Sequence, residues 1–431
     1  MSAAPRSRSV TAVGLSLWLI ALAVLGAGDM GGRQSRGTVS VLATWTGDEG
    51  DAFRGVLDTF SRTHRIHVDY QGTTALREVL SSEVDAGTPP DIAVLPSSGE
   101  LAAYAAGGRL IPLDDVVPAR PRAAYGRLWT PRVRVGGAER TYGVAIKADL
   151  KSIVWYDTRR RPGELPALAA DGRRWCVGMG GDATSGWPGT DWIEDLLLQQ
   201  QGAEVYQRWA TGRLAWDDPR MVRAWESWGA LFGAADAERA LITDFRAAGR
   251  GLFGGAGRPC ALEHQGSFIR GGYRPPSRAD FAFSAGLLPD ADRRSTAREV
   301  SGDFAAMFGD SPEARELMRY LASATAQRAW AEHTEPGRTR PFFANREVPL
   351  GVQSHDPVAR RIAHALRDSG ALCLDASDAM PTRMRLAFQR AVLEYLSDTG
   401  AGPARLLRSL ERVRGEIRGE PGRPWLSTVC G

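Results

Sequence analysis

The sequence has few cysteine and histidine residues and no extended block of one charge. Four of its 431 residues are cysteine and six are histidine, and no two cysteines have the CxxC spacing of a zinc or redox site. The net charge of +4 is small for this length, and no run of five or six like charges indicates a nucleic-acid-binding arm. We therefore expect no metal, no cofactor and no nucleic-acid partner.

Common hydrolase motifs are also missing. Neither GxSxG nor HExxH occurs, and the histidines have no metal-ligand spacing. Two carboxylate pairs, Asp217–Asp218 and Asp375–Asp378, leave a glycosidase open as an alternative, because such enzymes need two nearby acids. Hydrophobic residues make up 43% and charged residues 24%, which is typical of a globular protein and excludes wholesale disorder and a multi-span membrane protein. The length allows two or three domains.

The first residues have the layout of a secretory signal peptide. Arg6 and Arg8 precede an apolar stretch, Val10–Leu25, and small residues follow it. This stretch is shorter than the roughly 20 residues that a membrane-spanning helix needs, although an uncleaved anchor remains the alternative. Leu25–Gly28 resembles a lipoprotein cleavage box with glycine in place of the lipidated cysteine. We expect an exported, extracellular protein, with association with the cell surface left open and no lipid anchor at this point.

The four cysteines fit an oxidising compartment, where we expect two disulfides. Three pairings can be drawn among Cys176, Cys260, Cys373 and Cys430. We favour 176–260 and 373–430, because the first two lie in similar strand-like contexts. Four buried free thiols are the alternative.

Hydrophobic periodicity predicts alternating strands and helices. Strands are expected at 39–45, 66–70 and 91–95, with helices at 53–60 and 76–84 between them and a third helix opened by a capping box of Ser97 and Glu100. This order indicates βαβ units on a parallel sheet. A second α/β run has expected strands at 175–179, 260–268 and 281–288, and helices from about 191, from 218, from 311, at 382–396 and at 403–417. Together these elements predict two α/β lobes.

An ordered set of segments resembles extracellular solute-binding proteins of carbohydrate ABC importers (family 1). The segments are AFRGVLDTFSRTHRIHVDY, TPPDIAVLPSSGELAAYAAGGRLIPLDD, TYGVAIKADLKSIVWYD, RRWCVGMGGDATSGWPGTDWIEDLLLQQQGAEVYQRW, PCALEHQGSFI, VSGDFAAMFGDSPEA and LDASDAMP. They look closest to the alpha-glucoside-binding branch. The resemblance implies a two-lobed, type II periplasmic-binding-protein-like (Venus-flytrap) α/β fold with a hinge between the lobes.

By this resemblance the chain divides into discontinuous lobes. The expected parts are a signal peptide at 1–28, a linker at 29–37, lobe 1 at 38–145, lobe 2 at 146–289, a return segment of lobe 1 at 290–345, and C-terminal helices of lobe 2 at 346–431. The resemblance implies a monomeric, non-enzymatic receptor that binds a carbohydrate, an alpha-linked oligosaccharide, and delivers it to a membrane ABC permease. A secreted glycoside hydrolase and a flytrap sensor that presents a small solute to a membrane receptor are the alternatives.

Candidate ligand residues are those that suit a sugar, whose flat C–H faces pack on aromatic rings and whose hydroxyls bind polar groups. The loop after the first strand is well placed, because ligands bind at the carboxyl ends of strands in α/β sheets. It offers Trp45, Thr46, Asp48 and Glu49, although Trp45 could be core and the acids could only favour a helix start.

Other candidates follow from loops and from the lobe crossings. Trp187 and Asp191 lie in a Gly/Pro loop that enters a helix, and we expect Trp187 to stack on ligand while Trp192 packs in the core. The remaining candidates are Ser97, Lys147, Gln265, Ser267, Asp303 and Arg383. Maltose-binding relatives carry a Trp-Tyr pair where this chain has Phe388-Gln389, so a long maltodextrin fits less well than a smaller or more polar solute, and a non-sugar ligand stays open.

Overall fold

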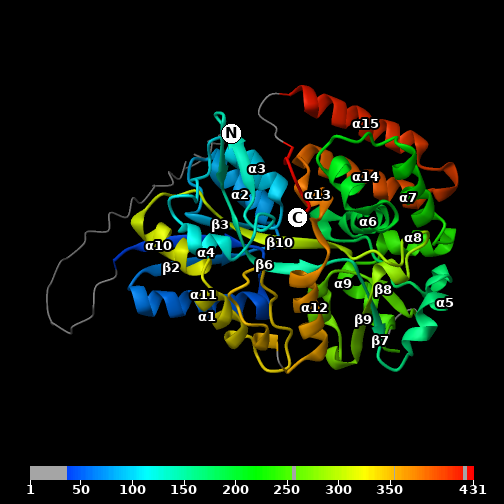
Figure 1. Cartoon of the computed structure of the whole chain (residues 1–431), viewed down its shortest axis with the longest axis horizontal. Coiled ribbons are helices and arrows are strands. Elements are labelled where there is room, and N and C mark those ends of the chain that lie inside the picture. Colours follow the sequence, from blue (N-terminus) through cyan, green and yellow to red (C-terminus); the bar gives the residue numbers. More distant parts are fainter. Residues whose placement is uncertain (1–35, 255–258, 354, 421–424) are drawn as a thin grey trace, which may run out of the picture. The chain divides into compact units, whose positions relative to one another are not determined.

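A mixed sheet of six strands and a smaller sheet of three organise the chain (Figure 1). The computed structural model describes residues 36–254, 259–353, 355–420 and 425–431. The predicted signal peptide at 1–28 lies outside the described residues, as does the linker up to residue 35. No helix among the described residues is long and apolar enough to cross a membrane.

The first part of the large sheet forms as predicted from local patterns. Strand β1 (Thr38–Ala43) pairs in parallel with β2 (His67–Gly72) and with β3 (Ile92–Leu95), and helices α1 (Gly47–His64) and α2 (Leu76–Asp85) connect them. Helix α3 (Ser98–Ala106) begins at the predicted cap, where the Ser97 hydroxyl accepts a hydrogen bond from the Glu100 amide. The apolar stripe of α1 is buried, which explains why its helical periodicity was visible in the sequence.

Two long antiparallel strands cross the large sheet side by side (Figure 1). They are β6 (Val144–Leu150) and β10 (Ala297–Met307). The second half of β10 pairs with β3, whereas its first half pairs with β11 (Ala371–Leu374). One strand therefore belongs to both halves of the sheet, and its register against β6 shifts between Asp303 and Phe304.

The small sheet has the order β8 (Leu262–His264), β7 (Ile153–Asp157), β9 (Ala279–Phe283), and all its pairs are antiparallel. The expected strand at 175–179 is wrong, since only Trp175 forms an isolated bridge, to Leu262. Gly178 in this stretch packs against backbone: a Cβ there would lie 2.8 Å from the Thr243 carbonyl oxygen. The segment thus threads past 243–244 instead of joining a sheet.

Helices surround both sheets, and two of them, besides α3, begin at caps that the sequence predicted. Helix α7 starts at Pro219 after its Asp218 cap, and α10 starts at Pro312 after its Ser311 cap. The remaining elements are α4 (Ala119–Ala123), β4 (Arg132–Val135), β5 (Ala138–Thr141), α5 (Leu165–Ala169), α6 (Trp187–Ala210), α8 (Ala234–Ile242), α9 (Phe245–Ala248), α11 (Ala324–His333), α12 (Pro357–Asp368), α13 (Ala376–Ala379), α14 (Thr382–Ser397) and α15 (Ala404–Gly419). Helix α6 begins earlier than expected, because Gly186 turns the chain with φ of 98° and Pro188 suits the first helical turn.

Both predicted disulfides are present. Cys176 bonds Cys260, and Cys373 bonds Cys430. The second one holds the C-terminal tail along β11, where the backbones of Leu372 and Gly431 exchange two hydrogen bonds of 2.9 Å each.

Candidate ligand-binding site

A cleft of about 540 Å³ opens beside the N-terminal end of α1 and the strand β6. Its opposite wall comes from α9 and the turn after β8, and a further wall comes from the end of α11 and the segment after it. The residues around it are Thr46, Asp48, Glu49, Ala52, Lys147, Asp149, Arg246, Phe268, Gly271, Gly272, Trp330, Thr334, Glu335, Arg338, Thr339, Arg340, Pro341 and Phe342. Its volume lies within the range of small-molecule sites.

Lys147 is the central charge of this cleft. Its Nζ lies 3.0 Å from Asp149, 3.2 Å from Glu49 and 3.5 Å from Asp303. The β6–β10 register places Lys147 opposite Asp303, so two strands and a helix terminus supply the four groups. Burial alone would lower the pKa of Lys147, but the three carboxylates raise it well above its usual value. The lysine is therefore a fixed cation.

Three carboxylates surround the single ammonium group of Lys147. A hydrogen bond from a neighbouring residue fixes the position of one of them. The Ser267 hydroxyl donates a 2.6 Å hydrogen bond to Asp149 and accepts one from the Leu150 amide. Glu49 remains about half exposed at the cleft. Carboxylate oxygens only accept hydrogen bonds when ionised, so this wall suits a ligand rich in hydroxyl donors.

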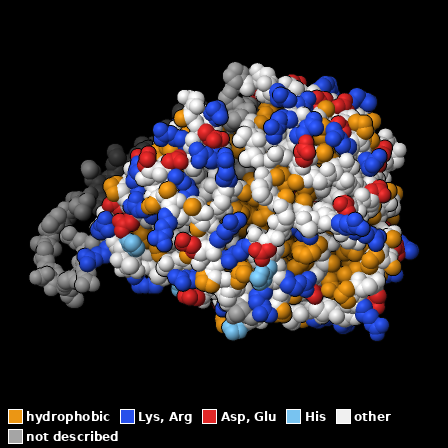
Figure 2. All heavy atoms as spheres, in the orientation of Figure 1, with side chains coloured by type: hydrophobic (Ala, Val, Ile, Leu, Met, Phe, Trp, Pro, Cys, Tyr) orange, Lys and Arg blue, Asp and Glu red, His pale blue; other side chains and the backbone are white. Residues whose placement is uncertain are grey.

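Aromatic rings and arginines complete the cleft. Phe268 is partly exposed at the cleft, Trp330 and Phe342 border it but are each only 2% exposed, and Arg338 forms a 2.5 Å ion pair with Asp48. Flat rings beside hydrogen-bonding groups are the combination that a sugar ring requires. On the face shown in Figure 2, acidic side chains are interspersed among arginines, so this face does not provide a strong field of one sign.

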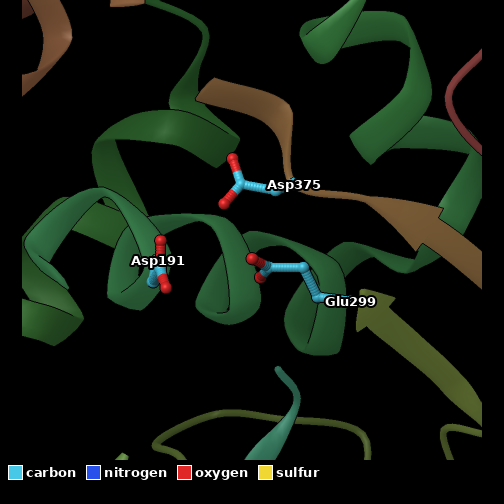
Figure 3. Close-up of side chains that lie close together, drawn as sticks. All are labelled: Asp191, Glu299 and Asp375. Atoms are coloured by element: carbon cyan, nitrogen blue, oxygen red, sulfur yellow. The ribbon is translucent and has the colours of Figure 1, made fainter. Parts of the chain in front are cut away.

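A second ionic cluster is buried near the start of α6. Asp191, Glu299 and Asp375 point toward one another, and one oxygen from each lies within 4.8 Å of the others (Figure 3). Three carboxylates at this spacing could hold a metal ion. Here the Nζ of Lys151 takes that position: it lies 2.8 Å from Asp191 and 4.0 Å from Glu299 and forms an ion pair with Asp375.

This buried cluster carries more acid than base. Burial raises the pKa of Asp191 and of Glu299 well above the usual carboxyl value, although Lys151 opposes the shift. For Asp375, burial acts in the same direction, but Lys151 and hydrogen bonds to Ser377 and the Asp378 amide lower its pKa. Since Lys151 is only 4% exposed, we assign this cluster to the stability of the fold.

The structure brings five of the sequence candidates together. Thr46, Asp48, Glu49 and Lys147 line the cleft, and Asp303 pairs with Lys147. The loop after β1 is therefore at the carboxyl edge of the sheet, where α/β folds present ligands.

Other candidates contact residues that line the cleft but do not line it themselves. Trp45 is 4% exposed and packs on Trp330, with ring centroids 4.6 Å apart, so it supports a residue that lines the cleft. Trp187 lies in the first turn of α6 and not in a loop, and it packs on Phe268, with centroids 5.9 Å apart. Ser267 acts through Asp149, as described above.

The remaining candidates serve local structure. The Gln265 side chain accepts a hydrogen bond from the Gly266 amide, and Asp191 belongs to the buried cluster. Ser97 caps α3 and donates to the Asp378 carbonyl oxygen. Arg383 is not among the residues around the cleft and forms ion pairs with Glu416 and Glu420.

Sequence reasoning missed Asp149, Trp330, Arg338 and Arg340. Asp149 follows Lys147 by two positions on one strand, so period-two alternation could have placed both on the same face. The two arginines lie in an irregular segment far along the chain, where no local periodicity signals a position at the cleft.

A buried Ser–Asp–His contact does not have the geometry of a hydrolytic triad. Asp195 accepts hydrogen bonds from Ser152 at 2.7 Å and pairs with His264 at 2.8 Å, so the carboxylate lies between the other two groups. A triad places the histidine in the middle, where it removes the proton from serine. This set holds β7, α6 and β8 together instead.

The carboxyl group of Asp303 makes the stability of the protein depend on pH. Burial raises its pKa to about 6, against the opposing charge of Lys147. Between about pH 4 and pH 6 the folded chain keeps a proton that the unfolded chain has released, so this carboxyl makes stability fall as pH rises through that window. We expect the free energy of unfolding of the wild type, minus that of Asp303→Asn, to fall from pH 4 to pH 6 and then to level off. Urea unfolding at pH 4, 5, 6 and 7 measures it, and a difference that does not change with pH would contradict this assignment.

Comparison with known families identifies the fold. Residues 43–328 match the model of the family described as bacterial extracellular solute-binding protein. The chain belongs to this family. Its members are described as extracellular solute-binding proteins.

Two curated relatives match most of the chain. The osmoprotective compounds-binding protein GgtB of Synechocystis sp. is 29% identical over 406 residues, which cover 88% of this chain and 93% of the relative. The alpha-glucosides-binding periplasmic protein AglE of Rhizobium meliloti is 28% identical over 403 residues, which cover 85% and 86%.

Solved structures share the two-lobed fold. The bacterial solute receptor AcbH, described as having an exclusive preference for β-D-galactopyranose, aligns with a TM-score of 0.70 at 15% identity over 89% of this chain and 99% of its own. A chitin oligosaccharide binding protein aligns with a TM-score of 0.68 at 16% identity over 88% and 98%. At these identities the likeness concerns the fold alone.

Proposed function

We propose that this protein is the monomeric, extracellular substrate-binding component of an ABC transporter and that it binds a carbohydrate, an alpha-linked oligosaccharide, for delivery to a membrane permease. The observation that carries the proposal is the cleft around Lys147, where acids, arginines and aromatic rings converge in a member of a solute-binding family. The relatives that bind alpha-glucosides or osmoprotective compounds support the choice of solute.

The working cycle follows from ligand contacts on both sides of the cleft. Glu49 and Asp48 come from the α1 side, while Phe268 and Arg246 come from the side of the small sheet. A ligand that touches both sides has more contacts in the closed form, and it stabilises that form by its differential affinity. The closed form is then the one that a permease recognises.

Thermal melting against a panel of mono-, di- and trisaccharides, polyols and amino acids tests the proposal. A solute at a hundred times its dissociation constant should stabilise the folded protein by about 2.7 kcal/mol. We expect an alpha-glucoside to raise the melting temperature and to be recovered intact by chromatography. Shifts with amino acids alone would overturn the carbohydrate assignment, and cleavage of the sugar would support the hydrolase alternative.

Glu49→Gln tests the site itself. The glutamine keeps the size but loses the charge of an acceptor, and hydrogen bonds to charged groups contribute about 1.5–3 kcal/mol. We expect the dissociation constant for the solute found in the panel to rise about 10- to 100-fold in calorimetry, with an unchanged melting temperature of the free protein. Glu78→Gln is the matched control, because Glu78 also lies in the first turn of a helix but away from the cleft residues. Equal affinity of the two variants would remove Glu49 from the site.

A further inference from the structure

Three carboxylates share one ammonium group beside the cleft, so one positive and three negative charges give this cluster a net charge of −2 when all four groups are ionised. Its members are Lys147 and Asp149 of β6, Asp303 of β10 and Glu49 of α1. The exposed fraction of the side chain is 9% for Lys147, 6% for Asp149 and 14% for Asp303, against 47% for Glu49. A surplus of buried charge costs free energy unless donors, water or a proton offset it.

The three carboxylates are not compensated equally. Asp149 accepts a 2.6 Å hydrogen bond from Ser267 in addition to its 3.0 Å contact with Lys147. Glu49 is half exposed, so water solvates its charge. Among the described residues, the one hydrogen-bond donor to the Asp303 carboxylate is the Nζ of Lys147 at 3.5 Å, the longest of the three contacts. Asp303 is therefore the carboxyl group of this cluster that accepts a proton most readily.

Asp303 differs from the other members in its relation to the cleft. Glu49, Lys147 and Asp149 border the cleft, whereas Asp303 only pairs with Lys147 from the neighbouring strand. A solute that fills the cleft displaces water from the open side of the cluster, and loss of water disfavours the charged form of a carboxyl group. Hydroxyl groups of the solute can donate to Glu49 and replace that water. Asp303 does not border the cleft, so it gains no such donor.

The charged groups that face Asp303 come from two elements, Lys147 and Asp149 from β6 and Glu49 from α1. Burial raises the pKa of Asp303 to about 6, Lys147 opposes this shift, and the charges of Asp149 and Glu49 add to it. The free protein therefore holds this carboxyl group close to the point at which a further loss of water changes its charge near neutral pH.

We propose that solute binding at the cleft is coupled to the uptake of a proton by Asp303, so that the receptor holds an uncharged polyhydroxylated solute more tightly in mildly acidic surroundings. The inference rests on the proposed function and adds a regulation of the same site. Because coupling between two ligands is reciprocal, a solute that favours the protonated carboxyl group is itself favoured by acid. Affinity is high while the carboxyl group is neutral in the free protein, falls as the pH rises through the pKa values of the free and bound forms, and then levels off.

Calorimetric titrations at pH 5, 6, 7 and 8 test this coupling. The probes are maltose and trehalose, together with any panel sugar that gives a larger melting shift. If binding raises the pKa of the carboxyl group by one unit, the dissociation constant of the wild type at pH 8 should be about tenfold that at pH 5. At pH 6.5, titrations in two buffers of different ionisation enthalpy should show the uptake of about half a proton per bound solute.

Asp303→Asn identifies the group that takes up the proton, because asparagine has the same size and no charge. We expect this variant to bind the solute at pH 8 about as tightly as the wild type does at pH 5, with no change between these pH values and no proton uptake. Asp58→Asn is the matched control: Asp58 is exposed on α1 and does not border the cleft, so this variant should keep the pH dependence of the wild type. The two-buffer titration of the wild type tests the coupling even if Asp303→Asn does not fold.

A wild-type dissociation constant that is the same at pH 5 and pH 8, or that is lower at pH 8, would overturn the coupling. A pH dependence that persists in Asp303→Asn would also overturn it, since another group would then carry the proton. Binding of no sugar by the wild type at any pH would overturn the proposed function and the coupling with it, so the two failures are distinguishable.

Discussion

Replacing Lys151 with methionine should lower the free energy of unfolding by about 3–5 kcal/mol, the range for removing one partner of a buried ion pair. Lys151 is the cation that the carboxylates of Asp191, Glu299 and Asp375 face. Methionine fills similar volume, so the loss comes from the uncompensated acids and not from a cavity. Urea unfolding at pH 7 measures the effect.

The loss of unfolding free energy in Lys151→Met should depend on pH and on the charges of the three facing carboxylates. Lys151 lowers the pKa values of Asp191, Glu299 and Asp375 in the folded protein, so these values rise without it. The variant therefore regains stability relative to the wild type as the pH falls and protons neutralise the cluster. Adding Asp375→Asn to Lys151→Met should recover part of the loss, because it removes one of the facing charges. A loss below 1 kcal/mol at pH 7, or one that is the same at pH 5, would show that the cluster is already neutral without the lysine.

Removing the Cys176–Cys260 disulfide by a double change to alanine should cost about 2–5 kcal/mol. The bond spans 84 residues, and in the chain-entropy model it restricts the unfolded state over that loop. Urea unfolding of the wild type and of the double-alanine variant measures this loss of unfolding free energy. The wild type is measured both with and without a reducing agent.

The second disulfide is the matched comparison. Cys373–Cys430 spans 57 residues, and because loop entropy grows with the logarithm of length, the two alanine pairs should differ by only about 0.3 kcal/mol from this cause. A much larger loss at 373–430 would mean that the bond also holds the tail that pairs with β11. Stability unchanged by either double change would contradict the presence of these bonds in the folded protein.

Local signals were sufficient to predict the first three strands of the large sheet and several helix starts. The capping residues Ser97, Asp218 and Ser311 each bond the first turn of their own helix, so their effect depends on a few neighbouring residues. The pairing of β10 with β3 at one end and β11 at the other depends on residues far apart in sequence, and no pattern within the strand reports it. The expected strand at 175–179 has strand-like residues, but the chain next to it offers a single bridge at Trp175.

The sequence predicted the cleft residues that lie near the end of a strand. It did not predict those that come from an irregular segment far along the chain. Asp48 and Glu49 lie in the first turn of α1, just after the loop that follows β1, and the rule that ligands lie at carboxyl ends of strands places them correctly at the cleft. Arg338 and Arg340 reach it from an irregular segment, which only the three-dimensional structure can position. Arg383 has the chemistry of a ligand residue, but it forms ion pairs with Glu416 of α15 and with Glu420, which follows that helix.

The shift in register between β6 and β10 has a mechanical consequence. Lys147 and Asp303 face each other at the point where β10 passes from its β11 neighbour to its β3 neighbour, and both strands continue through it without a break. A small change of angle between the two strands at this point would displace distant elements more than elements beside it. Under the proposed function, a solute bound beside Lys147 would contact the two strands that both halves of the large sheet share.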